Sequence, residues 1–163
     1  MSNDQHFIEH LLEGVKSNQI SIDEAKAQLS HYDELGFAKI DLHRAKRQGF
    51  PEVIFGQGKT KEQIDTIIAS LSHHHHVILV TRINEEKANY VLEKHPNLEY
   101  HAEAHIVCTP IASIQKSTNY VSVLCAGTSD LPISEEAAIT AELMGITVKR
   151  YYDVGVSGIH RLF

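Results

Sequence analysis

The feature that most constrains the fold is an alternation of short apolar runs with amphipathic segments from residue 37 onward. Residues 77–82 are nearly all apolar, which is typical of a buried strand. Residues 60–72 place isoleucine and leucine on one helical face, with Thr60 at the N-cap and Gln63 three residues later. The same reasoning predicts strands at 52–55 and 104–109 and a helix from Asn84 to about His95. The pattern predicts an α/β protein.

The first 36 residues carry a different pattern. Residues 4–17 place apolar side chains at helical spacing, which predicts an amphipathic helix. Ser21 and Glu24 form a capping box that opens a second helix. We therefore expect a helical hairpin that ends near Gly36 and serves in docking or oligomerisation.

The sequence pattern in the last third of the chain predicts a β-α-β unit. Residues 120–125 and 146–152 are expected to be strands, and residues 134–144 a helix that ends before Gly145. A loop and a further helix follow from residue 153. The expected domains are a helical hairpin at 1–36, a small α/β domain at 37–117 and an incomplete parallel-sheet domain at 118–163.

Composition excludes some classes of function. The formal charge of −6 argues against a nucleic-acid partner, because binding phosphates requires an excess of lysine and arginine. The longest apolar run, at 77–80, is too short to cross a membrane, and residues 1–10 carry no secretion signal. Two cysteines in apolar surroundings suggest a reducing compartment, so we expect a cytoplasmic protein.

Two polar, glycine-containing loops follow the last two expected strands. In open α/β sheets, ligands bind beyond the carboxyl ends of the strands. Glycines let a backbone approach a phosphate or ribose, and hydroxyl, carboxylate and cationic side chains can bind sugar and phosphate groups. The loops therefore predict a binding site rather than two plain turns. The candidate residues are Gly127, Thr128, Ser129, Asp130, Asp153, Gly155, Ser157, Gly158, His160 and Arg161.

Residues 56–60, GQGKT, lie between an expected strand and an expected helix. A nucleoside-triphosphate loop requires a glycine where this chain has Val53, so that reading fails. Two readings stay open: a plain turn, or a simple anion site that uses the helix N-terminus. The candidate residues are Gly56, Gly58, Lys59 and Thr60, joined by Arg44 and Arg47, which could otherwise be part of a solvated helix face.

Four consecutive histidines occupy residues 73–76. Consecutive residues at the end of a helix point around its axis, so their imidazoles do not converge on one ion. We therefore predict no metal site in this run.

Several motifs occur in the order in which they stand in a known family. They are DLHR at 41–44, RQGFPEVIFG at 47–56, GKT at 58–60, VTR at 80–82, AGTSDLP at 126–132, EEA at 135–137 and YDVGVSGIHRL at 152–162. Together they resemble the pyridinium biscarboxylic acid mononucleotide synthase (LarB) family, whose carboxyl-terminal domain is related to the purine-pathway mutase PurE. The resemblance runs from about Gly36 to the last residue.

The resemblance implies a reaction. The family carboxylates nicotinic acid adenine dinucleotide with CO2 and hydrolyses its phosphoanhydride, releasing AMP, to make a precursor of the nickel-pincer cofactor of lactate racemase. A cysteine thiolate adds to the pyridinium ring and activates it. The resemblance further implies a homo-oligomer with no tightly bound cofactor and a possible use of Mg²⁺. It also implies that residues 127–130 hold the phosphate and ribose of the substrate, with His160 and Arg161 near its reacting end.

The chain also departs from the family. The family's later glycine-rich segment and its nucleophilic cysteine have no counterpart here, and neither Cys108 nor Cys125 matches the nucleophile's motif. We therefore expect a truncated enzyme that is inactive alone. The alternative is a non-catalytic module for nucleotide binding or oligomerisation.

Overall fold

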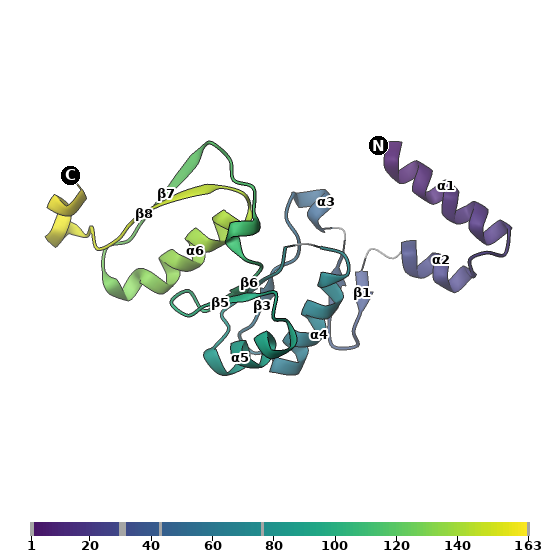
Figure 1. Cartoon of the computed structure of the whole chain (residues 1–163), viewed down its shortest axis with the longest axis horizontal. Coiled ribbons are helices and arrows are strands. Elements are labelled where there is room, and N and C mark those ends of the chain that lie inside the picture. The colour runs from purple at the N-terminus through teal and green to yellow at the C-terminus, as the bar shows by residue number, and fades with distance from the viewer. Residues whose placement is uncertain (1, 30–31, 43, 76, 163) are drawn as a thin grey trace. The chain divides into compact units, whose positions relative to one another are not determined.

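A computed structural model describes residues 2–29, 32–42, 44–75 and 77–162. The elements follow one another as Figure 1 shows by colour, from purple at the amino terminus to yellow at the carboxyl terminus. Helices alternate with strands, some of which pair in parallel, and this confirms the predicted α/β class. Contacts divide the chain into two compact units, residues 1–41 and 42–163.

The first unit contains two helices and a β-hairpin. Helix α1 is Ser2–Lys16 and α2 is Ile22–Leu29, and the predicted capping box of Ser21 and Glu24 is present. The expected helical hairpin does not continue to Gly36, because β1 (Tyr32–Glu34) pairs antiparallel with β2 (Lys39–Asp41). Gly36 has a φ of +80° in the turn between these strands, a conformation that glycine adopts easily. The boundary between the two compact units follows the hairpin, at residue 41.

A four-stranded mixed sheet is the centre of the second unit. The strands are β3 (Ile54–Phe55), β4 (Leu79–Thr81), β5 (Glu99–His101) and β6 (Ile106–Cys108). Their order is β3-β4-β6-β5, with β3 and β4 parallel and the other pairs antiparallel. The sequence did not predict β5, a short strand whose three residues are all half-buried.

Helices α4 (Lys61–Ser72) and α5 (Glu85–Lys94) begin where the sequence predicts. Thr60 and Gln63 form a capping box, and the Asn84 side chain accepts a hydrogen bond from the Lys87 N–H. Asp65 of α4 accepts hydrogen bonds from two residues at the end of α5, Lys94 and His95. The short helix α3 (Arg44–Gln48) precedes this region.

The predicted β-α-β unit is present in the last third of the chain. Strands β7 (Tyr120–Leu124) and β8 (Thr147–Tyr151) pair in parallel, and α6 (Leu131–Leu143) connects them. Gly145, with a φ of +80°, follows α6 as the sequence predicts. Short 3-10 turns lie before β7 (Ile111–Ser113), before α6 (Thr128–Asp130) and after β8 (Val156–Leu162).

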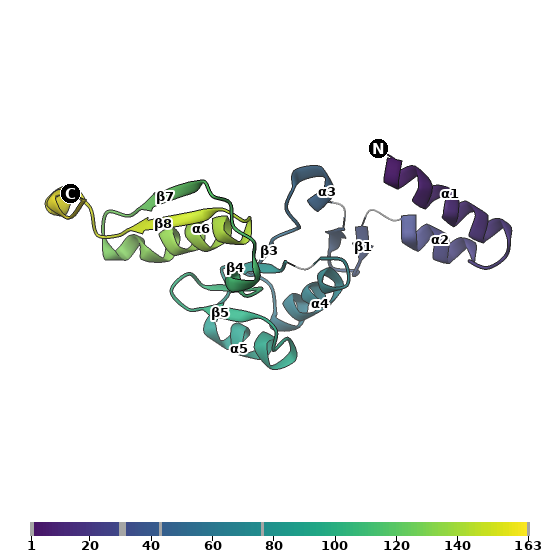
Figure 2. The same cartoon turned by 45° about the horizontal axis from the view of Figure 1, so that its top comes forward.

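Helix α6 packs on the central sheet. Ile139 and Leu143 are buried in one cluster with Leu79, Ile106 and Cys108 of the sheet. Arg82, just after β4, forms an ion pair with Glu136 of α6 at 2.6 Å. Figures 1 and 2 show α6 on one side of the sheet and α4 and α5 on the other. Residues 42–163 form one compact unit by their contacts, and the predicted domain boundary at residue 117, which lies inside this unit, stays a prediction.

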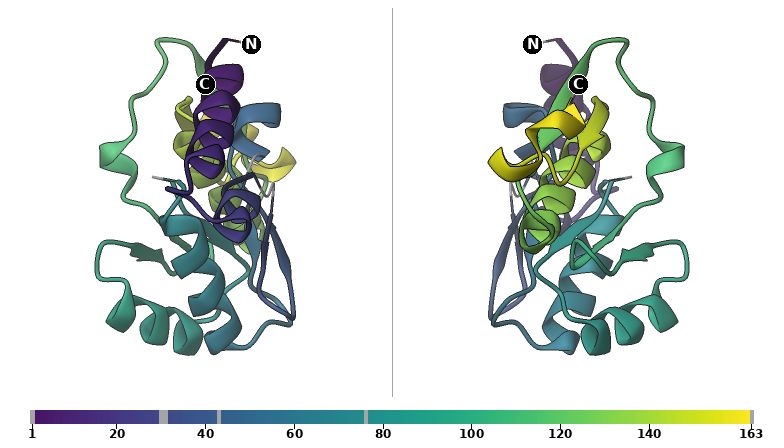
Figure 3. Two further views of the ribbon diagram at one scale, coloured as in Figure 1. Left: turned by 90° about the vertical axis from the view of Figure 1, so that its right-hand side faces the viewer. Right: turned by 90° about the vertical axis from the view of Figure 1, so that its left-hand side faces the viewer.

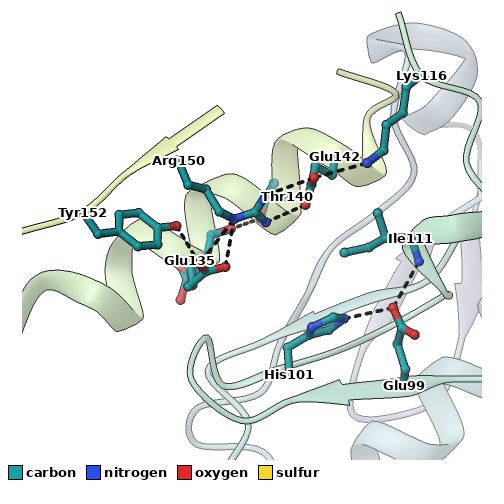
Figure 4. Close-up of polar contacts among 10 residues, drawn as sticks. Glu99, His101, Ile111, Lys116, Glu135, Thr140, Glu142, Arg150 and Tyr152 are labelled. Carbon is teal, nitrogen blue, oxygen red and sulfur yellow. Dashed lines mark hydrogen bonds and ion pairs between the residues drawn. The ribbon is translucent and has the colours of Figure 1, made fainter. Parts of the chain in front are cut away.

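A polar network joins α6 to β8 (Figure 4). Arg150 donates two hydrogen bonds to Glu142, at 3.1 and 2.6 Å, and pairs with Glu135 at 3.3 Å. Lys116 also donates to Glu142, at 3.2 Å, and the Tyr152 hydroxyl donates to Glu135 at 2.6 Å. These contacts fix the helix against the strand that leads into the second candidate loop.

Candidate functional site

The two loops that the sequence singles out lie side by side at the carboxyl ends of β7 and β8. They line an open pocket of about 430 Å³. The right-hand view in Figure 3 looks at this end of the chain, with the segment after β8 in yellow. The lining residues are Ala126, Gly127, Asp130, Asp153, Gly155, Val156, Ser157, Gly158 and Arg161.

Backbone hydrogen bonds hold the two loops together. The Val154 N–H donates to the Cys125 carbonyl at 3.1 Å, and the Gly155 N–H donates to the Ala126 carbonyl at 3.0 Å. A Cβ atom at Gly155 would lie 2.6 Å from that carbonyl oxygen. Glycine is therefore required at this position, because any side chain would push the loops apart.

Gly127 is a different case. Its φ of −146° is ordinary extended backbone, and nothing lies within 4 Å of the position that a Cβ atom would take. No contact within the described residues therefore requires glycine here. Gly127 is among the residues that line the pocket, so a ligand there could approach an unhindered backbone.

Charged side chains give the pocket its polar character. The Asp130 carboxylate accepts the Gly127 N–H at 3.2 Å through one oxygen, and a carboxylate has a second oxygen for a hydroxyl donor. Arg161 pairs with Asp153 and also donates to its backbone carbonyl, both through Nη1. A guanidinium carries donors on two further nitrogens, so Arg161 retains the capacity to bind an anion. The pocket thus combines acceptors for sugar hydroxyls with one cationic donor.

Not all of the candidate residues line the pocket. Thr128, Ser129 and His160 are exposed and stand outside its lining. Conversely, Ala126 and Val156 line the pocket although the sequence did not nominate them as binding residues. Both residues lie within the two loop segments that the sequence pattern marks, 126–130 and 153–161.

The other anion candidate, residues 56–60, is engaged in local contacts. Lys59 Nζ donates to the Phe55 carbonyl at 2.9 Å, and Thr60 caps α4. A Cβ atom at Gly56 would lie 2.9 Å from the Thr81 carbonyl oxygen, so this glycine serves strand packing. Arg44 is described in α3, whereas the side chain of Arg47 and all of His76 lie outside the described residues.

Neither cysteine is placed as a nucleophile. Cys125 is buried beneath the first loop, and its thiol donates to the Gly127 carbonyl at 3.1 Å. Cys108 is buried in the central sheet, where burial and the nearby Glu99 raise the pKa of its thiol to about 12. A thiol of that pKa is protonated at neutral pH and is a weak nucleophile.

The two pocket glycines give a matched pair of variants. We expect Gly155→Ala to lower the free energy of unfolding by about 1–3 kcal/mol, because its methyl group meets a backbone oxygen. Gly127→Ala should change it by less than about 0.5 kcal/mol, since the added methyl group meets no atom. Urea unfolding followed by circular dichroism measures both. Equal losses in the two variants would show that the loops do not approach one another as described.

Comparison with known proteins identifies part of the chain. Residues 32–111 match the LarB/PurE-like N-terminal domain. An uncharacterized protein of Methanocaldococcus jannaschii is 37% identical over 164 aligned positions, which cover 94% of this chain and 63% of that relative. The chain thus spans less than two thirds of the length of this relative.

None of the helices in the described ranges combines the length and the apolar character needed to cross a bilayer. The family match covers α3, α4, α5 and the whole central sheet, and the pocket lies beyond its last residue. Residues 32–111 thus form a domain that belongs to the LarB/PurE-like N-terminal family.

Proposed function

We propose that the protein binds nicotinic acid adenine dinucleotide for a PurE-related carboxylation. In this reaction CO2 forms a carbon–carbon bond to the pyridinium ring in place of a ring proton, which is released, and water hydrolyses the phosphoanhydride to release AMP. The product is pyridinium biscarboxylic acid mononucleotide, a precursor of the nickel-pincer cofactor of lactate racemase. The observation that carries the proposal is the pocket between residues 126–130 and 153–161, in a chain with a LarB/PurE-like domain. That family suggests a carboxylase-type reaction on a nucleotide.

The chemistry of the pocket supports a sugar and phosphate ligand. Asp130 and Asp153 would accept ribose hydroxyls, and Arg161 would donate to a phosphate oxygen. The dinucleotide offers both groups. Carboxylate oxygens also suit Mg²⁺, which would accompany the diphosphate rather than stay bound as a resident cofactor.

We expect residues 1–163 to bind the dinucleotide without carboxylating it. The proposed chemistry requires a thiolate at the pyridinium ring, and both cysteines of these residues are buried thiols. Mass spectrometry of the purified chain with dinucleotide, bicarbonate and Mg²⁺ should detect no biscarboxylated mononucleotide. Repeated turnover would contradict this expectation and would require a different nucleophile.

A calorimetric titration of the dinucleotide tests the binding proposal. Arg161→Ala should weaken binding by about tenfold, because a lost charge-assisted hydrogen bond costs about 1.5 kcal/mol or more. The loss should shrink as salt rises, since salt screens exposed charges. Lys59→Ala is the matched control from the other anion candidate and should leave the affinity unchanged. A loss with Lys59→Ala alone would move the site to residues 56–60.

The alternative function is an oligomerisation module that binds no nucleotide. It is favoured by the exposed apolar side chains of β7, among them Val121 and Leu124, which are 45% and 53% exposed. Sedimentation analysis measures association of the chain and the calorimetric titration measures dinucleotide binding, so together they separate the two functions. Association of wild-type chain without any dinucleotide binding would favour the module over the proposed function.

A further inference from the structure

A second cluster of side chains lies on the central sheet, outside the pocket. Glu99 and His101 are two residues apart on β5, so their side chains leave the same face of the strand. Cys108 of β6 is the direct cross-strand partner of Glu99 and therefore lies on that face too. Each of the three offers one possible ligand atom, and these atoms all lie within 4.8 Å of one another.

Hydrogen bonds already orient part of this cluster (Figure 4). His101 Nε2 lies 3.0 Å from Glu99 Oε1, which also accepts the Ile111 N–H at 3.1 Å. This N–H belongs to the 3-10 turn that follows β6, so the turn fixes the carboxylate over the sheet. Metal-binding carboxylates are commonly held by hydrogen bonds of this kind.

Burial gives the cluster one closed side and one open side. Cys108 is fully buried, whereas the Glu99 and His101 side chains are 39% and 30% exposed. An ion could therefore enter past the carboxylate and the imidazole and reach the sulfur. Water can take a fourth position on the exposed side, as it does where zinc has three protein ligands.

We propose that Glu99, His101 and Cys108 bind a divalent transition metal of the zinc class. A carboxylate, an imidazole and a thiolate form a mixed set that zinc accepts, whereas Mg²⁺ and Ca²⁺ prefer oxygen ligands alone. Bonds of about 2.0–2.3 Å to a shared ion place ligand atoms roughly 3.3–3.8 Å apart. The Glu99 and His101 atoms already lie 3.0 Å apart, and all three atoms lie within 4.8 Å, so binding requires shifts of about 1 Å or less. Binding displaces the thiol proton to solvent, and no electron is transferred.

The competing explanation is structural. Glu99 and His101 would be a surface pair at the edge of the sheet, and Cys108 a small apolar side chain in the core. The two explanations differ in one observable property, because only the metal site places a sulfur on the ion. The sequence pattern, Glu-x-His with a cysteine seven residues after the histidine, does not by itself indicate a site, because only the β5–β6 pairing brings the three residues together.

Cobalt(II) titration of the full chain, prepared without a histidine tag, tests the proposal. We expect one equivalent of Co²⁺ to give a thiolate-to-cobalt charge-transfer band in the near ultraviolet, which Zn²⁺ then abolishes by displacement. Cys108→Ser should remove the band. His101→Gln should weaken binding by about 100-fold or more, beyond the 10- to 100-fold typical of residues that only orient ligands.

Two control variants separate this cluster from other ligands. Cys125→Ser changes the other cysteine and should keep the band, and His74→Gln changes the histidine run and should keep the affinity. Circular dichroism establishes that each variant is folded, and the half-exposed His101 provides a test that does not alter the core. Co²⁺ binding without the charge-transfer band, a band lost with Cys125, or equal affinity in wild type and His101→Gln would overturn the proposal.

Discussion

Leu143→Ala is expected to lower the free energy of unfolding by about 2–5 kcal/mol, the range for removing a buried leucine side chain. Leu143 is 3% exposed and ends α6 within the cluster that includes Leu79 and Ile106 of the central sheet. Shortening it leaves a cavity where the β-α-β unit meets the sheet. The loss should appear as a lower urea midpoint in unfolding followed by circular dichroism.

Met144 provides the control for this prediction. It is the next residue along the chain, but it is 48% exposed. Met144→Ala should therefore change stability by no more than about 0.5 kcal/mol. If the two variants lost the same stability, α6 would not be docked on the sheet, and residues 118–163 would be a separate domain as the sequence suggested.

Glu142→Ala is expected to lower the free energy of unfolding by about 2–4 kcal/mol, almost as much as Leu143→Ala, because it removes the carboxylate that two cations share. The Glu142 side chain is 9% exposed and accepts hydrogen bonds from Arg150 and Lys116. Both cations would remain in partly buried positions without this carboxylate. Urea unfolding at pH 7 measures the loss, and Glu142→Gln, which keeps the shape, should recover part of it.

The same contacts make this stabilisation depend on pH. Hydrogen bonds from Arg150 lower the pKa of Glu142, burial opposes the shift, and Lys116 adds to it. A carboxyl with a lowered folded-state pKa stabilises the fold above its unfolded pKa of about 4.3 and loses this effect as pH falls through the folded value. The difference between wild type and Glu142→Ala should therefore shrink below pH 4. A constant difference down to pH 2 would contradict the ion-pair explanation.

Local signals explain which elements were predictable. Helix-capping residues act on backbone groups within a few residues of themselves, so the helices that they begin or end follow from short stretches of sequence. The capping residues are Thr60 and Gln63 for α4, Asn84 for α5 and Gly145 for the end of α6. The parallel β7–β8 pair was predictable because two apolar runs flank one helix of suitable length.

Long-range contacts explain what was missed. Strand β5 is formed by pairing with β6, and residues 99–101 alone carry little of an apolar pattern. The β1–β2 hairpin replaced the end of a predicted helix because pairing between residues 32–34 and 39–41 overrides local propensity. The docking of α6 depends on a sheet face formed by β4 and β6 together, and no short stretch of sequence contains both strands.

The sequence predicts that the two candidate loops lie close together, but it does not predict which of their residues line the pocket. Topology puts both loops at the same edge of a parallel pair, so their proximity follows from the sequence pattern. The directions of Thr128, Ser129 and His160 depend on the turns of residues 128–130 and 156–162. Such turns leave side-chain direction undetermined until the fold is known.

The central claim is that the dinucleotide binds between the loops after β7 and β8. Nuclear magnetic resonance of the ¹⁵N-labelled chain tests it most directly, because glycine amides report on backbone contact. On addition of nicotinic acid adenine dinucleotide, the amides of Gly127, Gly155 and Gly158 should shift, while those of Gly56 and Gly58 should stay in place. Shifts confined to Gly56 and Gly58, or unchanged spectra at saturating dinucleotide, would contradict the claim.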